Sequence, residues 1–407
     1  MSTTPQSPTR LAAPPPLVAP WSLKLGASLL AALGAAAFAW ALAHNEPALA
    51  WSAYLIGAFL ALGLGVFGVL WISILYLAKG AWSVSMRRIP EAMTAWLVPG
   101  GALALAVLLG APYLYEWADG TAVARDPALA HKAAFLNPTL FAIVLGASVC
   151  AWAFLGSRLV RNSRRQDLSG DLAASRANVR WSAVFVVVYA LTFSATSFYL
   201  LMSLEARWFS TIYGVLAFTD MMQAGLAFVS LVAAVFIWRG RLAGFLNENH
   251  LHSVAKMLFA VTGFWAYIYF CQFLLIWYGN LPEEVVYFTR RSANGWLPYL
   301  LVLPLAKFAL PFLLLMRRQA KRSARRVAGV AVWVLFAQIF ELFILVAPSV
   351  GGADGTVVTE GHLPIIEALV ALGFLGAFTL VFIGALGRHN PVPHRDPRLR
   401  ECLDMHS

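Results

Sequence analysis

Charged side chains are scarce in this chain of 407 residues: they make up only 12% of it, while 60% of the sequence is hydrophobic. Soluble domains carry about 25% charged residues. This shortage excludes a water-soluble globular protein and indicates an integral membrane protein. The motifs of soluble enzymes, such as a phosphate-binding loop or a nucleophile elbow, are missing as well.

The usual ligands of metals and redox cofactors are also few. Cys150, Cys271 and Cys402 stand alone, without the Cys-x-x-Cys spacing of an iron–sulfur or zinc site. A transmembrane b-type haem needs histidine ligands that project from membrane-spanning helices. All eight histidines lie instead in loops, in tails or in the first turn of an apolar run: His44, His131, His250, His252, His362, His389, His394 and His406. We therefore expect the chain to bind no haem, iron–sulfur cluster or metal, whereas quinone or quinol stays open.

Long apolar runs are what the sequence does contain. A run of about 20 residues is enough to cross the hydrocarbon core as a helix. Ten such runs predict an all-α integral membrane protein with about ten transmembrane helices: Ser22–Ala43, Ser52–Leu77, Ala92–Leu114, Pro138–Ser157, Val179–Met202, Trp208–Trp238, Val254–Tyr278, Trp296–Met316, Val327–Ala347 and Pro364–Leu386.

The connections between these runs predict the orientation. The two tails and every second loop together hold 24 lysines and arginines, and the alternate loops hold only 5. Because lysine and arginine collect on the cytoplasmic side, both termini are expected there. The net charge of +11 then reflects topology and gives no support to a nucleic-acid partner. The basic clusters at 158–165 and 317–326 are suited to anionic membrane lipids.

These patterns divide the chain into three parts. Residues 1–21, with Pro14, Pro15, Pro16 and Pro20, form a predicted disordered cytoplasmic tail. Residues 22–386 form the polytopic transmembrane domain, and residues 387–407 form a cytoplasmic C-terminal tail that is short enough to dock on a partner.

Three ionisable residues lie well inside apolar runs: Asp220, Lys307 and Glu341. A charge at the bilayer centre costs about 2.5 to 3.5 kcal/mol on insertion scales, so such residues are functional candidates. We expect Asp220 and Lys307 to form a buried ion pair. Glu91 and Glu367 lie in first turns, and we interpret them as helix-capping carboxylates.

Uncharged polar residues extend the same pattern. Gln223 follows Asp220 by about one turn, Gln272 lies on the seventh run, and Gln338 shares a helix face with Glu341. Short connections favour antiparallel packing of these helices as a bundle, about residues 208–347, in which the polar groups converge. Two interpretations stay open, a proton-handling track and interhelical hydrogen bonds that hold the bundle together.

Seven blocks of this sequence resemble the second quinone-binding-type membrane subunit of alternative complex III, a bacterial respiratory quinol oxidoreductase, over about residues 51–403. The blocks are Arg207-Trp208-Phe209-Ser210-Thr211-Ile212-Tyr213-Gly214, Asn249-His250-Leu251-His252-Ser253-Val254-Ala255-Lys256, Phe264-Trp265-Ala266-Tyr267, Gln272-Phe273-Leu274-Leu275-Ile276-Trp277-Tyr278, Pro282-Glu283-Glu284-Val285-Val286-Tyr287, Pro311-Phe312-Leu313-Leu314 and Asp396-Pro397-Arg398-Leu399-Arg400-Glu401-Cys402-Leu403.

The resemblance implies the fold of the polysulfide-reductase membrane subunits, with two four-helix bundles flanked by outer helices. It implies a place in the bacterial inner membrane as a haem-free subunit of a quinol:cytochrome c oxidoreductase. It also implies partners: a multihaem cytochrome c, an iron–sulfur protein and a sister quinol-binding membrane subunit. Proteins of this kind are described either as quinone-binding subunits or as proton conductors. An amide is expected at the position of Lys307 and an aspartate at that of Glu341, so this chain departs from the pattern at both.

Our leading hypothesis is a subunit that moves protons through its second bundle. The track would run through Asp220, Lys307, Glu341, Gln272 and Gln338, with His252 and Lys256 at the cytoplasmic mouth and Glu283 and Glu284 at the opposite mouth. Two alternatives are a secondary transporter with a mid-membrane site and a structural scaffold subunit. The sequence shows no clear internal repeat of the kind that transporters commonly carry.

Overall fold

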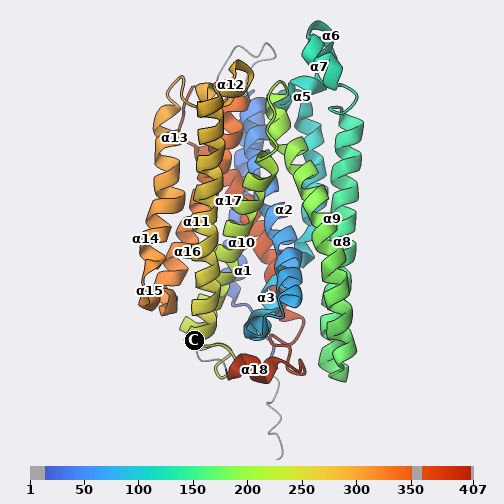
Figure 1. The fold of residues 1–407 in the computed structure, drawn as a ribbon, viewed down its shortest axis with the longest axis vertical. Helices are drawn as coiled ribbons and strands as arrows, with labels where there is room; N and C mark the ends of the chain where they lie inside the picture. The colour runs from blue at the N-terminus through green and yellow to red at the C-terminus, as the bar shows by residue number, and fades with distance from the viewer. Residues whose placement is uncertain (1–13, 351–359, 405–407) are drawn as a thin grey trace, which may run out of the picture.

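The computed structural model describes residues 14–350 and 360–404. Within these ranges all regular structure is helical and no strand occurs, as the sequence predicts (Figure 1). In the described part of the chain, ten helices or helical series are long and apolar enough to span a membrane, and the chain is a multi-pass integral membrane protein. Residues 1–13 of the predicted disordered tail lie outside the described residues, and residues 14–20 form no helix.

The ten spans follow one another along the chain. They are α1 (Trp21–Ala43), α2 (Pro47–Leu77), a third span made of α3 (Arg88–Met93), η2 (Thr94–Trp96), α4 (Leu97–Leu105), η3 (Ala106–Gly110) and α5 (Ala111–Leu114), then α8 (Pro138–Ser169), α9 (Leu172–Leu200), α10 (Tyr213–Trp238), α11 (Glu248–Gly279), an eighth span made of α13 (Leu297–Pro304), η6 (Leu305–Ala309) and α14 (Leu310–Met316), then α16 (Ala324–Val346) with η7 (Ala347–Ser349), and α17 (Ile365–Gly387).

Short helices lie in the connections at both ends of the molecule. One end, which we call the basic face, carries η1 (Ala81–Met86), α15 (Arg318–Arg322) and α18 (Leu399–Leu403). The other end, the opposite face, carries η4 (Glu116–Ala118), α6 (Gly120–Arg125), α7 (Pro127–Lys132), η5 (Met202–Glu205) and α12 (Pro282–Arg290).

The spans pack as two groups of four. In the first group α2 packs against the third span and α9, and α8 packs against α9 and α4. In the second group α10 packs against α11 and α16, and the eighth span packs against α11 and α16. The outer helices α1 and α17 pack against each other, and both contact α2. The expected pair of four-helix bundles with flanking helices is therefore present (Figure 1).

Glycines allow the closest helix approaches. A Cβ atom at Gly34 of α1 would lie 2.6 Å from the Cα atom of Gly373 of α17, so this crossing requires glycine on both helices. A Cβ atom at Gly68 of α2 would lie 2.6 Å from the carbonyl oxygen of Pro90. Close neighbours on all sides bury the whole hydrophobic stretch of α2, which makes it the central helix.

The C-terminal tail docks on the chain's own basic face. Asp396 is buried and accepts from Arg87 at 2.5 Å. Farther along, the Sγ atom of Cys402 lies 2.9 Å from the Ser85 hydroxyl and 3.2 Å from Nε2 of His250. The tail thus connects α18 to η1 and to the first turn of α11.

Candidate functional site

Three spans bring four of the predicted polar residues together at one place in the second group. Asp220 lies on α10, Lys307 on η6, and Gln338 and Glu341 on α16, and all four side chains are buried, with at most 2% of their surface exposed. We call these four residues the buried cluster. Asp220 lies seven residues after the start of α10.

Lys307 is the centre of the buried cluster. Its ammonium donates to Asp220 Oδ1 at 2.7 Å and to Gln338 Oε1 at 3.0 Å, and it forms an ion pair with Glu341 Oε2. The Nζ atom also lies 4.9 Å from the centre of the Trp265 ring on α11, within the range of a cation–π contact. The expected ion pair between Asp220 and Lys307 is therefore confirmed, and Glu341 is a second ion-pair partner of Lys307.

Glu341 has partners on two helices besides Lys307. Trp265 Nε1 donates to Glu341 Oε1 at 2.9 Å, and Gln338 Nε2 donates to Glu341 Oε2 at 3.3 Å. The contact to Gln338 follows from the i, i+3 spacing on α16. The hydrogen bond from the Trp265 indole was not predicted. Trp265 lies on α11, and the spacing of ionisable residues along α16 does not show which side chains of another helix lie nearby.

The backbone around Lys307 departs from α-helical geometry. Residues Leu305–Ala309 form a π-helix, an element often found at functional sites. Pro311 has no N–H group, so it cannot donate to the carbonyl of Lys307 four residues earlier. That carbonyl instead accepts from Gln223 Nε2 of α10 at 3.1 Å, and the same amide group donates to Thr262 Oγ1 of α11 at 3.0 Å. The Gln223 amide group thus connects the Lys307 backbone to α10 and α11.

The buried cluster contains two carboxylates and one ammonium group. Buried charges are stable only when they are paired and hydrogen-bonded. Lys307 can neutralise one of the two carboxylates, and the second carboxyl group can hold or release one proton. Asp220 Oδ2 has no protein hydrogen-bond partner within the described part of the chain, which leaves an acceptor for a water or a proton.

Further polar atoms without a protein partner lie on the basic side of the buried cluster. Among the residues that the structure describes, these include Gln223 Oε1, Ser230 Oγ and His252 Nδ1. Gln223 and Ser230 are seven residues apart on α10 and therefore share a helix face. Buried polar atoms of this kind are commonly satisfied by internal water.

The predicted mouths of the track lie farther away. His252 is buried in the first turns of α11, thirteen residues or about 20 Å before Trp265, with exposed Lys256 one turn on. Toward the opposite face, Gln272 is buried and its Nε2 atom has no partner in the described chain. Glu283 is exposed and Glu284 is half-buried, both in the first turn of α12. In the described structure no hydrogen bond or ion pair joins any of these five side chains to the buried cluster.

A second buried ion pair, which the sequence did not indicate, lies at the opposite face. Arg291 donates to Glu205 Oε1 at 2.5 Å, to the carbonyl oxygens of Ile344 and Leu345, and to Ser349 Oγ at 2.8 Å. Its guanidinium also lies 3.6 Å from the ring centre of Tyr287. Arg291 and Glu205 are near span ends, where charged residues are common. Only their burial distinguishes them from the other charged residues at such ends.

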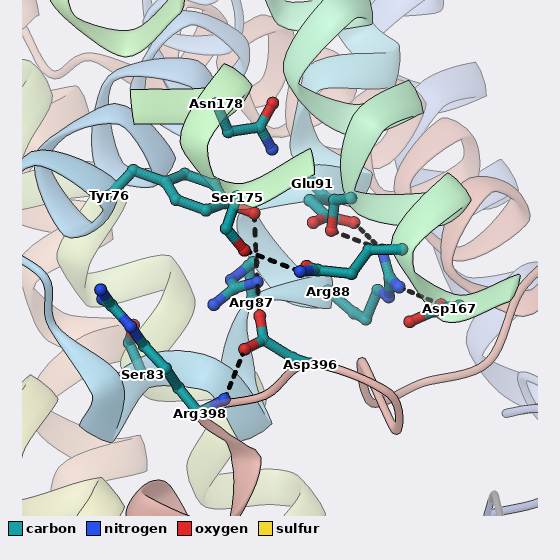
Figure 2. A network of polar contacts seen from close by, with 12 residues as sticks. Tyr76, Ser83, Arg87, Arg88, Glu91, Asp167, Ser175, Asn178, Asp396 and Arg398 are labelled. Carbon is teal, nitrogen blue, oxygen red and sulfur yellow. Dashed lines mark hydrogen bonds and ion pairs between the residues drawn. The ribbon is translucent and has the colours of Figure 1, made fainter. Parts of the chain in front are cut away.

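The basic face holds a third network (Figure 2). Arg87 contacts Asp396 and the Tyr76 hydroxyl, and Arg88 forms ion pairs with Glu91 and Asp167. Glu91 lies in the first turn of α3, the position expected for a carboxylate near a helix N-terminus, and it is also the ion-pair partner of Arg88. Glu367 lies likewise in the first turn of α17, and it accepts from His362 Nε2 at 2.8 Å.

No group of three or more histidine, cysteine, aspartate or glutamate residues is arranged to hold a metal ion within ranges 14–350 and 360–404. Comparison with known proteins adds no assignment, because no protein-family model matches the chain and no curated protein matches it. What the site does must therefore be argued from its own residues.

Proposed function

We propose that this chain is a haem-free membrane subunit of a respiratory quinol:cytochrome c oxidoreductase of the alternative complex III type, and that it conducts protons through its second four-helix group. The buried cluster around Lys307 is the observation that carries the proton proposal. The sequence resemblance carries the assignment to the complex, together with the proposed location in a bacterial inner membrane with cytoplasmic termini. A quinone-binding surface on this chain rests on that resemblance alone.

The chemistry of the buried cluster supports proton transfer. Asp220 and Glu341 both contact one ammonium group, so a proton that arrives at either carboxylate changes the charge that Lys307 has to balance. Ionisable relays at membrane depth are typical of proton-moving proteins. The Lys307 ammonium lies within hydrogen-bond distance of Asp220 and Gln338, which is the geometry that proton transfer needs.

Water would complete the route on both sides. From the basic face the proposed order is His252 and Lys256, then Ser230 and Gln223, then the buried cluster. From there it continues past Gln272 to Glu283 and Glu284. The polar atoms without protein partners at Ser230, Gln223 and Gln272 lie along this order and support water-filled links.

The first experiment tests the complex. The full chain is purified through an affinity tag in mild detergent, and the eluate is examined by peptide mass spectrometry and by haem and iron assays. Co-purification of a multihaem cytochrome and an iron–sulfur protein is the expected result. Elution of the chain alone, without haem, would reject the assignment to a respiratory complex.

The second experiment tests the proton route. Glu341→Gln keeps the size of the side chain and removes its exchangeable proton, so it should abolish coupled proton release while the complex still assembles. Glu367→Gln is the matched control, because it alters a buried carboxylate outside the buried cluster. Protons released per electron are measured in vesicles. An unchanged proton stoichiometry in Glu341→Gln would contradict the proposal.

One observation favours a secondary transporter as the second candidate. The third span is interrupted by two 3₁₀ segments and the eighth by a π-helix, and these are the third spans of the two five-span halves. Transporters with internal repeats bind solutes at broken helices in corresponding positions. Proton uptake that requires an added solute, in vesicles containing this chain alone, would support the transporter and exclude the respiratory assignment.

A further inference from the structure

A basic cavity of about 460 Å³ lies at the basic face, outside the proposed proton route. Its walls come from the C-terminal end of α2, the N-terminal part of α9 and the tail segment that precedes α18. Figure 2 shows part of its floor, where Tyr76, Arg87, Ser175, Asp396 and Arg398 lie close together. Neither of the two basic clusters noted in the sequence, at 158–165 and 317–326, lines this cavity.

Positive charge dominates the lining. Five cationic side chains face one carboxylate, that of Asp396, and the cations are Lys79, Arg87, Arg176, Arg180 and Arg398. Arg87 and Asp396 pair with each other. The other four cations form no ion pair with any residue in the described chain, and Lys79, Arg176 and Arg180 are exposed. Guanidinium groups bind phosphate oxygens in a bidentate manner, so an anionic phosphate group fits this cavity.

An apolar groove of about 490 Å³ continues from the basic cavity. The two share Leu75 of α2 and Lys79 and Gly80 of the turn after it. The remainder of the groove is mostly apolar and runs between α2 and α11, lined by Trp71, Ile74, Ala78, Ala81, Trp82 and Met257, with Glu401 as its one acidic residue. A free phosphate ion would fill only the basic cavity, whereas a phospholipid would fill both.

Lys79 lies at the junction between cavity and groove in an uncommon backbone conformation. Its φ is +52°, in the left-handed region, and Gly80 N–H donates to the Leu75 carbonyl at 2.9 Å to close the end of α2. Glycine is the residue that most readily adopts this conformation at a helix end. Lys79→Gly therefore removes one charge from the cavity with no added backbone strain.

We infer that the basic cavity and the apolar groove together form a binding site for an anionic phospholipid, with the phosphate group beside Arg176, Arg180 and Lys79 and one acyl chain along Trp71 and Met257. The lipid would lie between the two four-helix groups at the basic face and would cover the end of α2. The inference is independent of the proposed proton route, because it involves none of the residues of that route.

Native mass spectrometry of the purified full chain with added phosphatidylglycerol or phosphatidylcholine tests this site. The wild-type chain should retain phosphatidylglycerol at least about 10-fold more strongly. Each charge near an anionic headgroup changes affinity about 5-fold, so Lys79→Gly should weaken binding about 5-fold and Arg176→Gln/Arg180→Gln about 25-fold. Arg239→Gln/Arg241→Gln alters two exposed arginines elsewhere on the basic face, outside the cavity and outside both basic clusters, and should change binding less than about 2-fold.

Three results would overturn the inference. Equal retention of phosphatidylcholine and phosphatidylglycerol would show that the cations do not select the headgroup. Unchanged phosphatidylglycerol binding in Lys79→Gly, a variant that keeps the backbone conformation, would place the lipid elsewhere. Displacement of phosphatidylglycerol by millimolar inorganic phosphate would identify a free-phosphate site in place of a lipid site.

Discussion

Replacing Lys307 with methionine is the most direct test of the buried cluster. Methionine fills a similar volume but removes the ammonium group that contacts both Asp220 and Glu341. The two carboxyl groups would then be buried with no positive charge beside them. Removing one partner of a buried ion pair costs about 3 to 5 kcal/mol, because the remaining charge is left without compensation.

A neutral version of the same cluster separates charge from packing. In the triple variant Asp220→Asn, Lys307→Met, Glu341→Gln no charge is buried, and replacing a whole buried ion pair by neutral groups is often close to neutral for stability. We therefore expect the triple variant to regain most of the roughly 3 to 5 kcal/mol that Lys307→Met alone loses. Lys256→Met, at an exposed lysine, should stay within about 0.5 kcal/mol of the wild-type chain.

The assay is unfolding of the purified chain in mixed micelles, followed by tryptophan fluorescence. Wild-type stability in Lys307→Met would refute the reasoning, because it would mean that the ammonium does not neutralise the buried carboxylates. A triple variant as unstable as the single variant would refute it in another way, since the loss would then come from packing.

Two further predictions concern the opposite face. The hydrogen bond from His362 to Glu367 raises the pKa of His362 above its usual value of about 6.5. The protonated histidine therefore stabilises the folded chain fully below about pH 6.5, and this stabilisation is lost as the pH rises through the raised pKa. The melting temperature of His362→Gln should therefore fall below wild type at about pH 6 and approach it at about pH 9, and a difference independent of pH would contradict this assignment. Arg291→Met should lose about 3 to 5 kcal/mol by leaving Glu205 buried alone, Arg291→Met/Glu205→Met should lose less, and denaturant titration of both variants would show whether the pair acts as a unit.

The length of the apolar runs was sufficient to predict all ten spans, but it did not predict where each span ends. The fourth span was expected to stop at Ser157, yet α8 continues to Ser169. The basic cluster that begins at Arg158 looked like a loop because of its charge. Arginine and leucine are good helix formers, however, so the helix continues out of the apolar region until Gly170, whose φ of +69° ends it.

The composition of the buried cluster was largely readable from the sequence, because ionisable groups inside apolar runs are rare and costly. Its geometry was not. The contact from Trp265 to Glu341 and that from Gln223 to the Lys307 carbonyl depend on how the spans rotate against one another. Helix rotation is determined by side-chain packing across the bundle, and periodicity along one helix does not contain that information.

The contact between Arg87 and Asp396 has a consequence for synthesis in the cell. The two residues are separated by 309 positions, and all the spans from the third to the tenth lie between them. At about 5 to 20 residues per second, Arg87 is made some 15 to 60 s before its partner exists. During that interval its guanidinium must stay hydrated or be held by other groups, so the basic face can close only as a late step of biogenesis. A chain that stopped before Asp396 would leave Arg87 permanently without its ion-pair partner at this face.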